Sequence, residues 1–453
     1  MHTKKFGITL KSVKRFLELG ANLNIIRILE QSHPADIAHL FRHLSTEEKK
    51  KLFRIVRSGE SLAAQVLSEM GEDHWAELVA DLDSQEASEI VQEMESDDAA
   101  DLLAIFEEEK AREIIHLMQD EEAASEVEML LDYDEDTAGG IMNPDVFAVH
   151  EGVRVSEAVD LIRKAEEMEM VFYVYVIDGH RHLLGVVSLR QLIVSPPNLT
   201  MREIMNPDVI YVTEDMDQEE VAREVERYGL VAIPVVSREH HLLGIVTVDD
   251  VIGVIREEAT EDLYKMAGTD DEEITSKSSF KIARIRFPWL TATLVAGIAN
   301  SYVITNFQDS LHKVIALAAF IPVILGMGGN IGGQSAVIVV RGMALGKIDL
   351  EHLFRVMFKE VRVGLILGFI YGNLLGVLAY LFFESTPLLG LVVGLSICAS
   401  MLFAVTIGVL YPMFFKKIGV DPAVATHPFV TTSTDLVGIL IYFGIARILL
   451  LEV

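Results

Sequence analysis

The sequence predicts a multidomain membrane protein in which an acidic soluble half precedes a transmembrane domain of five α-helices. Charge is the first observation behind this prediction: residues 1–270 hold 25 basic and 57 acidic side chains, whereas residues 271–453 hold 13 and 11. Five apolar stretches after residue 285 are the second observation, and an internal duplication in the soluble half is the third. The predicted domain boundaries are 1–30, 31–138, 139–200, 201–255, 256–280 and 281–453.

Composition limits the partners of the soluble half. An acidic surface of this size repels nucleic acid and anionic lipid and attracts cations, so we expect no nucleic-acid partner. The single cysteine, Cys398, lies in an apolar run, which excludes disulfides and thiolate metal sites. The start "MHTKKFGITLKSVKRFL" lacks the apolar core of a signal peptide, so the soluble half is expected in the cytoplasm. Residues 1–30 read as a basic amphipathic helix without an assigned role.

Residues 31–138 predict an all-α N-domain, a small helical superhelix built from short amphipathic helices. Two capping boxes mark helix starts, Ser45 with Glu48 and Asp83 with Glu86. Acidic clusters separate the apolar positions, and most of these carboxylates are expected to form a solvated face.

Two α+β repeats follow the N-domain. "IMNPDVFAVHEGVRVSEAVDLI" and "IMNPDVIYVTEDMDQEEVAREV" open with six identical residues at a spacing of 63. Each repeat reads as strand, helix, strand, turn, strand, helix. This pattern resembles a tandem pair of CBS domains, modules that sense adenine nucleotides or ions. The resemblance implies an acidic residue for a ribose at the start of the last helix. Asp250 occupies that position in the second repeat, whereas Gln191 occupies it in the first. Any ATP binding is therefore expected to be weak and centred on Asp250.

An acidic connecting helix is expected to leave the second repeat. Glu258, Glu261 and Asp262 share one face of this helix, and Asp249 and Asp250 lie upstream. Like charges at this spacing repel. One interpretation is a solvated helix, and the other is a set of divalent-cation bridges to the acidic N-domain. Oxygen ligands favour a hard cation, and Mg²⁺ needs only one or two carboxylates, although Mn²⁺ and Co²⁺ also fit.

Five stretches are long and apolar enough to cross a bilayer as helices, which takes roughly 20 residues. They are Phe287–Phe307, Val314–Val340, Val363–Phe383, Leu388–Phe414 and Pro428–Leu451. Basic residues precede the first stretch, separate the second from the third and follow the fourth. The positive-inside rule therefore predicts a multi-pass protein of the cell membrane with a cytoplasmic N-terminus and an external C-terminus.

The second stretch contains "PVILGMGGNIGGQSA", whose glycines, proline and amide residues are unusual for a helix that only faces lipid. Gly329 and Gly333 form a GxxxG pair that favours close helix packing. The alternative is a broken or tightly packed helix that faces a water-filled path, with Asn330 and Gln334 along it.

The fifth stretch carries a carboxylate, Asp435, after a run of hydroxyl residues. Such a group near the centre of a bilayer costs about 2.5–3.5 kcal/mol on insertion scales, so it indicates either a cation path or a helix cap near the cytoplasmic interface. The candidate pore-lining residues beside it are Asn330, Gln334, Gly329, Gly333, Thr431, Thr432, Thr434 and His427.

Over residues 31–453 the chain resembles MgtE-type magnesium transporters. The motifs that carry the resemblance are "YDEDTAGGIMNP", "PVILGMGGNIGGQSA" and "DPAVATHPFVTTSTD". The resemblance implies a homodimer in the lipid bilayer, with a central pore in which Asp435 holds a hydrated Mg²⁺. It also implies a cytosolic Mg²⁺ sensor at Asp97, Asp101, Asp250, Glu258, Glu261 and Asp262.

Two positions depart from the pattern of this family. Gly253 stands where another sensor carboxylate is expected, so one regulatory site is expected to be weaker. His427 stands where a neutral Asn is common, which predicts either pH-dependent transport or an interfacial histidine without a role.

The predicted function is Mg²⁺ import through a pore that cytosolic Mg²⁺ closes, without enzymatic activity. A dication entering an inside-negative cell gains about 2 × 2.3 kcal/mol per 100 mV, and the chain has no GxxxxGK[ST] loop for nucleotide hydrolysis. The alternatives are a CBS-gated transporter of another divalent cation or of an organic solute. A membrane enzyme is a further alternative, for which His427 near Asp435 is the only candidate pair.

Overall fold

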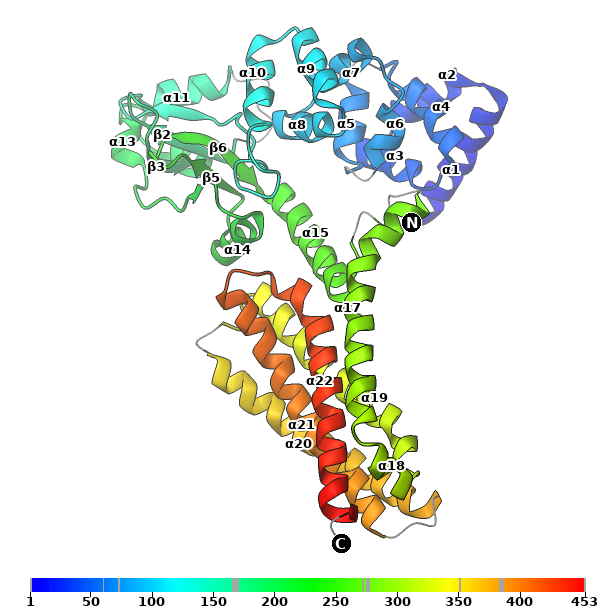
Figure 1. Cartoon of the computed structure of the whole chain (residues 1–453). Helices are drawn as coiled ribbons and strands as arrows, with labels where there is room; N and C mark the ends of the chain where they lie inside the picture. The colour runs from blue at the N-terminus through cyan, green and yellow to red at the C-terminus, as the bar shows by residue number, and fades with distance from the viewer. Residues whose placement is uncertain are drawn as a thin grey trace. The chain divides into compact units, whose positions relative to one another are not determined.

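The structure is a computed structural model that describes residues 2–451, except residues 60, 72–73, 165–170, 271–272, 274–277, 350–351 and 383–386. The chain divides into two compact units, Met1–Ile255 and Arg256–Val453 (Figure 1). Each unit is described by itself.

Over its described residues, the first unit begins with ten short helices. Both predicted capping boxes are present: the Ser45 amide donates to Glu48 Oε2 at 2.8 Å, and the Glu86 amide donates to Asp83 Oδ1 at 2.8 Å. The predicted single helix in residues 1–30 is wrong, because Gly20 adopts φ +64° and separates two helices. The helices are α1 His2–Leu19, α2 Asn22–Leu29, α3 Pro34–Phe41, α4 Thr46–Val56, α5 Leu62–Ser68, α6 Trp75–Val79, α7 Ser84–Val91, α8 Ser96–Ala104, α9 Glu108–Leu117 and α10 Glu121–Leu130.

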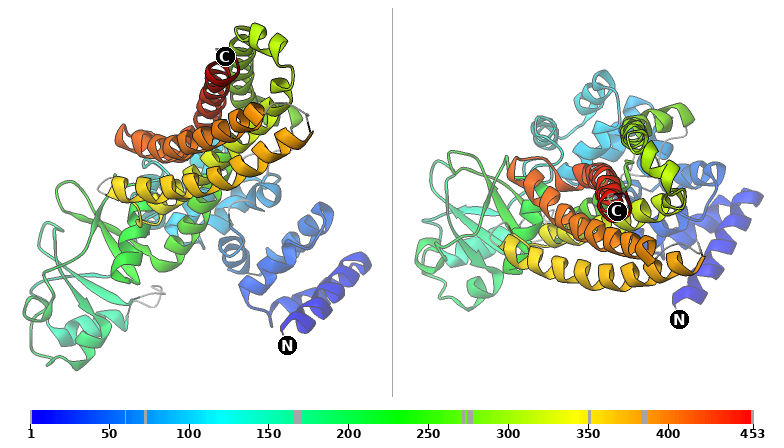
Figure 2. Two further views of the ribbon diagram at one scale, coloured as in Figure 1. Left: turned by 90° about the horizontal axis from the view of Figure 1, so that it is seen from below. Right: turned by 60° about the horizontal axis from the view of Figure 1, so that its bottom comes forward.

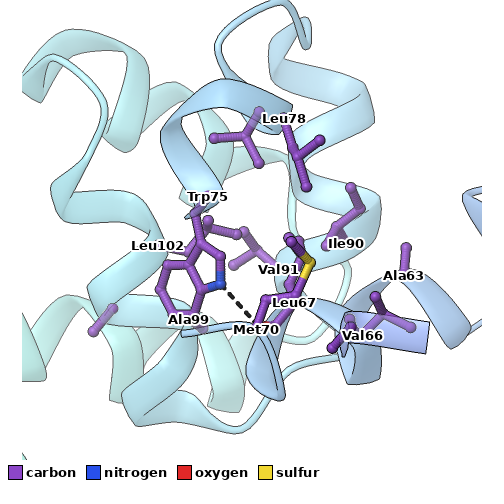
Figure 3. Close-up of a cluster of buried hydrophobic side chains, with 14 of the residues drawn as sticks. Ala63, Val66, Leu67, Met70, Trp75, Leu78, Ile90, Val91, Ala99 and Leu102 are labelled. Carbon is purple, nitrogen blue, oxygen red and sulfur yellow. Dashed lines mark hydrogen bonds between the residues drawn. The ribbon is translucent and has the colours of Figure 1, made fainter. Parts of the chain in front are cut away.

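Trp75 is the largest side chain of the core that joins these helices. Its ring is 1 % exposed and packs among aliphatic residues of the neighbouring helices, such as Leu102 and Val91 (Figure 3). The indole Nε1 donates to the Leu67 carbonyl at 2.8 Å, so the one polar atom of the ring is satisfied. The apolar faces predicted from sequence therefore form one continuous core.

Two three-stranded sheets follow, one for each repeat. The strand orders β1-β2-β3 and β4-β5-β6 are the same, with a parallel first pair and an antiparallel second pair. This confirms the predicted duplication. The strands are β1 Ala148–His150, β2 Tyr173–Ile177, β3 Leu183–Ser188, β4 Val212–Thr213, β5 Ala232–Val236 and β6 Leu242–Thr247. The helices are α11 Val155–Ile162, α12 Leu189–Val194, α13 Met201–Ile204, α14 Gln218–Tyr228 and α15 Val248–Ala267.

The second unit contains five helices long and apolar enough to cross a membrane. Most of them extend beyond the predicted stretches, so basic residues expected in loops lie on helices instead; Arg355, Lys359 and Arg362, for example, belong to α20. A short helix, α18 Gln308–Lys313, connects the first two, and a π-helical turn, Arg447–Leu451, ends the last. The five helices are α17 Ser279–Thr305, α19 Leu317–Ala344, α20 Leu353–Phe382, α21 Pro387–Lys417 and α22 Pro422–Ala446.

Glycines bring the membrane helices close together. Helices α20 and α21 run side by side (Figure 2), and a Cβ added at Gly372 would lie 2.6 Å from the Gly394 carbonyl oxygen. Gly376 and Gly390 approach each other in the same way one turn away. Small residues allow such close packing in lipid, where no hydrophobic effect drives helices together.

Candidate ion pathway and carboxylate cluster

Asp435 lies in the middle of helix α22. The helix begins at Pro422, and its N-cap is Asp421, whose side chain accepts from the Ala423 amide at 2.8 Å. At 1.5 Å per residue, Asp435 is about 20 Å along the axis from the first helical residue. The interpretation of Asp435 as a helix cap is therefore wrong, and its half-buried carboxylate has to be explained inside the membrane domain.

The glycine-rich segment of α19 packs directly against this part of α22. A Cβ added at Gly329 would lie 3.5 Å from Thr431 Cγ2 and 4.0 Å from Asp435 Oδ1. One turn away, a Cβ at Gly332 would lie 2.9 Å from Val430 Cγ1. Gly329, Thr431 and Asp435 are thus brought together as predicted, because glycine leaves room beside the carboxylate.

Helix α19 is continuous from Leu317 to Ala344, so the predicted break is wrong. The helix is tightly packed, and a water-filled path beside it stays a prediction. The closest approach also differs from the predicted pair Gly329 and Gly333. Gly332 lies against Gly408 of α21 so closely that a Cβ at Gly408 would overlap the Gly332 carbonyl. The position that touches α21 is therefore one residue before Gly333.

Two amide side chains of α19 lie on its exposed side. Asn330 and Gln334 are one turn apart and exposed, on the same face as Pro322 and Gly326. A polar stripe of this kind is costly against lipid, where amides lack partners. Some other group has to cover this face in a membrane.

The hydroxyl residues before Asp435 differ in burial and in their hydrogen bonds. Thr434 is 3 % exposed and donates to the Thr431 carbonyl at 3.0 Å, so it is a packing residue. Ser433 bonds to the Tyr411 hydroxyl at 2.7 Å, whereas Thr432 is half-buried. The side chain of His427 lies outside the described residues, so the structure does not test its predicted role.

Glu360 of α20 is a second carboxylate in the membrane domain, which the sequence analysis missed. It is 5 % exposed and accepts from Ser335 Oγ of α19 at 2.8 Å. The missed signal is its spacing: Glu360, Gly364, Gly368 and Gly372 recur every four residues along one buried stripe. Glu360 therefore ties α20 to the glycine-rich helix rather than lying in a loop.

In the first unit, α8 and the start of α15 bring four carboxylates together. Asp97 is 9 % exposed, and its Oδ1 has no hydrogen-bond partner among the described residues. Burial, followed by the charges of Asp250, Asp98 and Glu95, raises the pKa of Asp97 well above its usual range. Burial also raises the pKa of Asp98, to which the charge of Asp249 contributes.

Asp250 shows how strongly this cluster resists ionisation. Burial first, and then the charges of Asp249 and Asp98, raise the pKa of Asp250 to about 6, although the Thr247 hydroxyl donates to the carboxylate and opposes the shift. Carboxylates crowded in this way gain a favourable partner from a hard cation such as Mg²⁺. The orphaned oxygen of Asp97 fits such a ligand, and Asp98 is a member that the sequence analysis did not single out.

The other predicted sensor residues are less tightly grouped. Asp101 lies one turn after Asp97 on α8 and is half-buried, and Glu258 and Asp262 are half-buried on α15. Glu261 pairs with Lys265, whose Nζ also lies 3.0 Å from Asp421 Oδ2, so one lysine is shared by two carboxylates. Within the described residues, no three His, Cys, Asp or Glu side chains form a ready metal cage.

The first repeat uses Gln191 for its own structure. The Gln191 side-chain amide donates to the Ile204 carbonyl at 2.5 Å, which fixes the side chain against the backbone. Asp250 occupies the equivalent position of the second repeat and retains a carboxylate. The two repeats are therefore chemically unequal, as the sequence predicted. Gly253 is half-buried on α15, and a Cβ added there would meet nothing within 4 Å.

Comparison with known families accounts for most of the chain. The family described as divalent cation transporter, MgtE, matches residues 321–445. The MgtE intracellular N domain matches residues 32–136, and the CBS domain matches residues 138–196 and 201–257. These matches confirm the predicted sequence of helical N-domain, paired CBS domains and membrane domain.

Curated relatives and solved structures agree with these matches. The magnesium transporter MgtE of Thermus thermophilus is 42 % identical over 326 residues, which is 71 % of this chain and 72 % of the relative. The magnesium transporter MgtE of Enterococcus faecalis is 39 % identical over 70 % of each chain. A crystal structure of the cytosolic domain of the Mg²⁺ channel MgtE with ATP is 38 % identical and covers 54 % of this chain and 99 % of that one, with a TM-score of 0.51. A crystal structure of the soluble part of a magnesium transporter is 29 % identical and covers 56 % of this chain and 99 % of that one, with a TM-score of 0.50.

Proposed function

Since the chain belongs to the MgtE family of magnesium transporters, we propose that it carries Mg²⁺ across the cell membrane along a path beside Asp435. The observation that supports this path is the position of Asp435 in mid-helix against Gly329 of α19. A carboxylate at that depth is costly unless a cation passes it. Glycine opposite the carboxylate leaves room for an ion that retains several water ligands, as Mg²⁺ does.

The exposed stripe of α19 supports a homodimer. Asn330 and Gln334 project from the face that other helices of the same chain leave uncovered. A second copy related by a two-fold axis would cover this face and place two copies of α19 and α22 around one pore. Amide side chains lining that pore would bind the hydration shell of the ion.

The membrane potential supplies the driving force in this mechanism. A dication moving to the inside-negative side gains about 2 × 2.3 kcal/mol per 100 mV, so no ATP-driven step is required. The basic residues at the ends of α19, α20 and α21 support a cytoplasmic N-terminus and an external C-terminus.

Cytosolic Mg²⁺ is proposed to close the pore by binding the crowded carboxylates. Asp97, Asp98 and Asp250 repel one another when ionised, and a dication between them removes that cost. Ions that bind the closed form more tightly shift the population toward it. Asp101, Glu258, Glu261 and Asp262 extend the proposed sensor, although Glu261 must first exchange Lys265 for the ion.

Replacing Asp435 by Ala tests the pathway. Mg²⁺ flux into proteoliposomes that hold a Mg²⁺-sensitive dye is expected to fall to the level of empty liposomes, because the only carboxylate at mid-depth of α22 is lost. Asp309→Ala, in the short helix α18, is the matched control and should leave the flux unchanged. Size-exclusion chromatography checks that the variant keeps the size of the parent. Normal flux through Asp435→Ala would exclude the proposed pathway.

Two alternatives share the same sensor. Transport of another divalent cation, such as Mn²⁺ or Co²⁺, would be detected by replacing Mg²⁺ in the same liposomes. An organic solute would need aromatic or arginine residues in the spans to hold it; Arg447 caps the end of α22, and Arg362 lies nine residues after the start of α20. ATP is a proposed weak ligand of the CBS pair, with Asp250 as the residue that would hold its ribose.

A further inference from the structure

The helices that precede the matched N domain form one wall of a cleft. Helices α1 and α2 pack against α4 at one end of the helical array (Figure 1), and the cleft between them has a volume of about 640 Å³. Residues 1–31, which form one wall of the cleft, lie outside the matched family regions, whereas the α4 wall lies inside the matched N domain. We propose that the cleft binds the phosphate headgroup of an anionic membrane lipid.

The basic side chains of α4 divide into two groups. Lys49 and Lys50, together with Arg57 at the C-cap of the helix, are ion-paired to acidic residues that follow α4 in the chain. The other two, Lys51 and Arg54, line the cleft, are exposed, and make no ion pair within the described residues. They lie three residues apart on one helix face, so both can reach the same phosphate. Among the described lining residues Glu18 is the one acidic side chain, which leaves a positive balance there.

The opposite wall selects a lipid over a nucleotide. Leu17 and Ile26 supply aliphatic surface there, Ile55 of α4 adds to it, and the described lining residues include no aromatic ring on which a base would stack. Leu19, also in the lining, is 67 % exposed, and Leu23 just beyond the cleft is 76 % exposed. Aliphatic side chains beside unpaired cations are typical of proteins that lie at a membrane interface.

The outer face of α1 also combines basic and aliphatic side chains. Ile8 is 66 % exposed, and Lys11 and Arg15 follow it at helical spacing before Leu19. The inner face is held down by Val13, which is 0 % exposed, so the outer face is free of the core. This side of the helix offers cations and aliphatic groups together.

Charge separates this region from the rest of the soluble unit. Residues 1–60 contain 12 basic and 6 acidic side chains, whereas residues 61–270 contain 13 and 51. The earlier expectation that the acidic half repels anionic lipid therefore holds for residues 61–270 and reverses for residues 1–60. Basic residues near an anionic leaflet each strengthen binding about five-fold, and this attraction extends only about 8 Å at physiological salt.

Photo-cross-linking tests the proposal on the full-length protein in a mild detergent. Phosphatidylglycerol and phosphatidylcholine, each with a photoreactive acyl chain, are added separately, and the labelled peptides are identified by mass spectrometry. Phosphatidylglycerol is expected to label peptides of α1, α2 and α4, and phosphatidylcholine is not. The double substitution Lys51→Gln with Arg54→Gln is expected to weaken this labelling roughly thirty-fold, as two lost charges predict. Labelling of α17–α22 peptides should not change and serves as an internal reference.

Arg42→Gln with Arg112→Gln is the matched control, because both residues are exposed and neither lines the cleft. It should leave the labelling of the cleft intact. Equal labelling by the two lipids in the parent protein would overturn the proposal, and so would labelling that survives the cleft substitutions. Glycerol 3-phosphate or an oligonucleotide that displaces phosphatidylglycerol at equal concentration would assign the cleft to a soluble phosphate or to nucleic acid instead. A cytosolic melting temperature equal to that of the parent checks the fold of each variant.

Discussion

Replacing Asp250 by Asn removes one charge from the carboxylate cluster of the first unit while keeping an acceptor for the Thr247 hydroxyl. The pKa of Asp250 is raised from 3.8 to about 6, chiefly by burial. At 1.36 kcal/mol per unit, this shift corresponds to a cost of about 3 kcal/mol for the ionised form in the folded protein. Because the folded pKa lies above the unfolded one, the stabilising contribution is complete below about pH 4 and is lost as the pH rises through about 6.

The variant is therefore expected to be more stable than the parent at pH 7.5 without Mg²⁺, by up to about 3 kcal/mol. For a unit of this size, that difference corresponds to a rise of roughly 6–12 °C in the melting temperature. At pH 4 the two proteins should melt together, because Asp250 is protonated in the folded parent. Addition of Mg²⁺ at pH 7.5 should raise the melting temperature of the parent more than that of the variant.

Fluorescence of Trp75 measures this transition in full-length protein with Trp289→Phe as the common background, since the chain has two tryptophans. Trp75 lies in the core of the first unit, so its emission follows the unfolding of that unit. The exposed Asp208→Asn is the control and should change neither the melting temperature nor its pH dependence. A variant that is less stable than the parent at pH 7.5, or a difference that persists at pH 4, would refute the electrostatic reasoning.

Three further predictions follow from the contacts described above. Gly332→Ala is expected to destabilise the membrane unit by about 1–3 kcal/mol, because the new Cβ would lie 2.9 Å from Val430; Gly297→Ala in α17, which meets nothing within 4 Å, should be neutral in a thermal melt in detergent. In isothermal titration calorimetry, Asp250→Asn should abolish the weak binding of ATP, whereas Gln191→Ala should leave it unchanged; tight binding lost only at Gln191 would reverse this assignment. Patch currents should no longer be inhibited by internal Mg²⁺ when three carboxylates of α15 are neutralised together, and currents that stay fully inhibited would contradict the gating proposal. These are Glu258, Glu261 and Asp262.

Local patterns in the sequence determined the architecture. The five apolar stretches, the repeated "IMNPDV" and the two capping boxes each depend on residues within a few turns of one another. Such features survive in any tertiary arrangement, and the structure contains all of them. Helix ends were less accurate: α20 begins at Leu353 rather than Val363, because basic residues at a membrane interface continue a helix as well as a loop.

Tertiary structure alone decided how the carboxylates are used. Asp435 could have been a cap until the helix start at Asp421 excluded it, and Glu360 looked like a loop residue until Ser335 was found against it. Asp98 joins the cluster around Asp250 only because α8 packs close to the start of α15. The residues of each pair are distant in the chain, and periodicity fixes which face of a helix is buried but not which other helix meets that face. The burial and the neighbouring charges that shift a pKa arise only where two helices pack together.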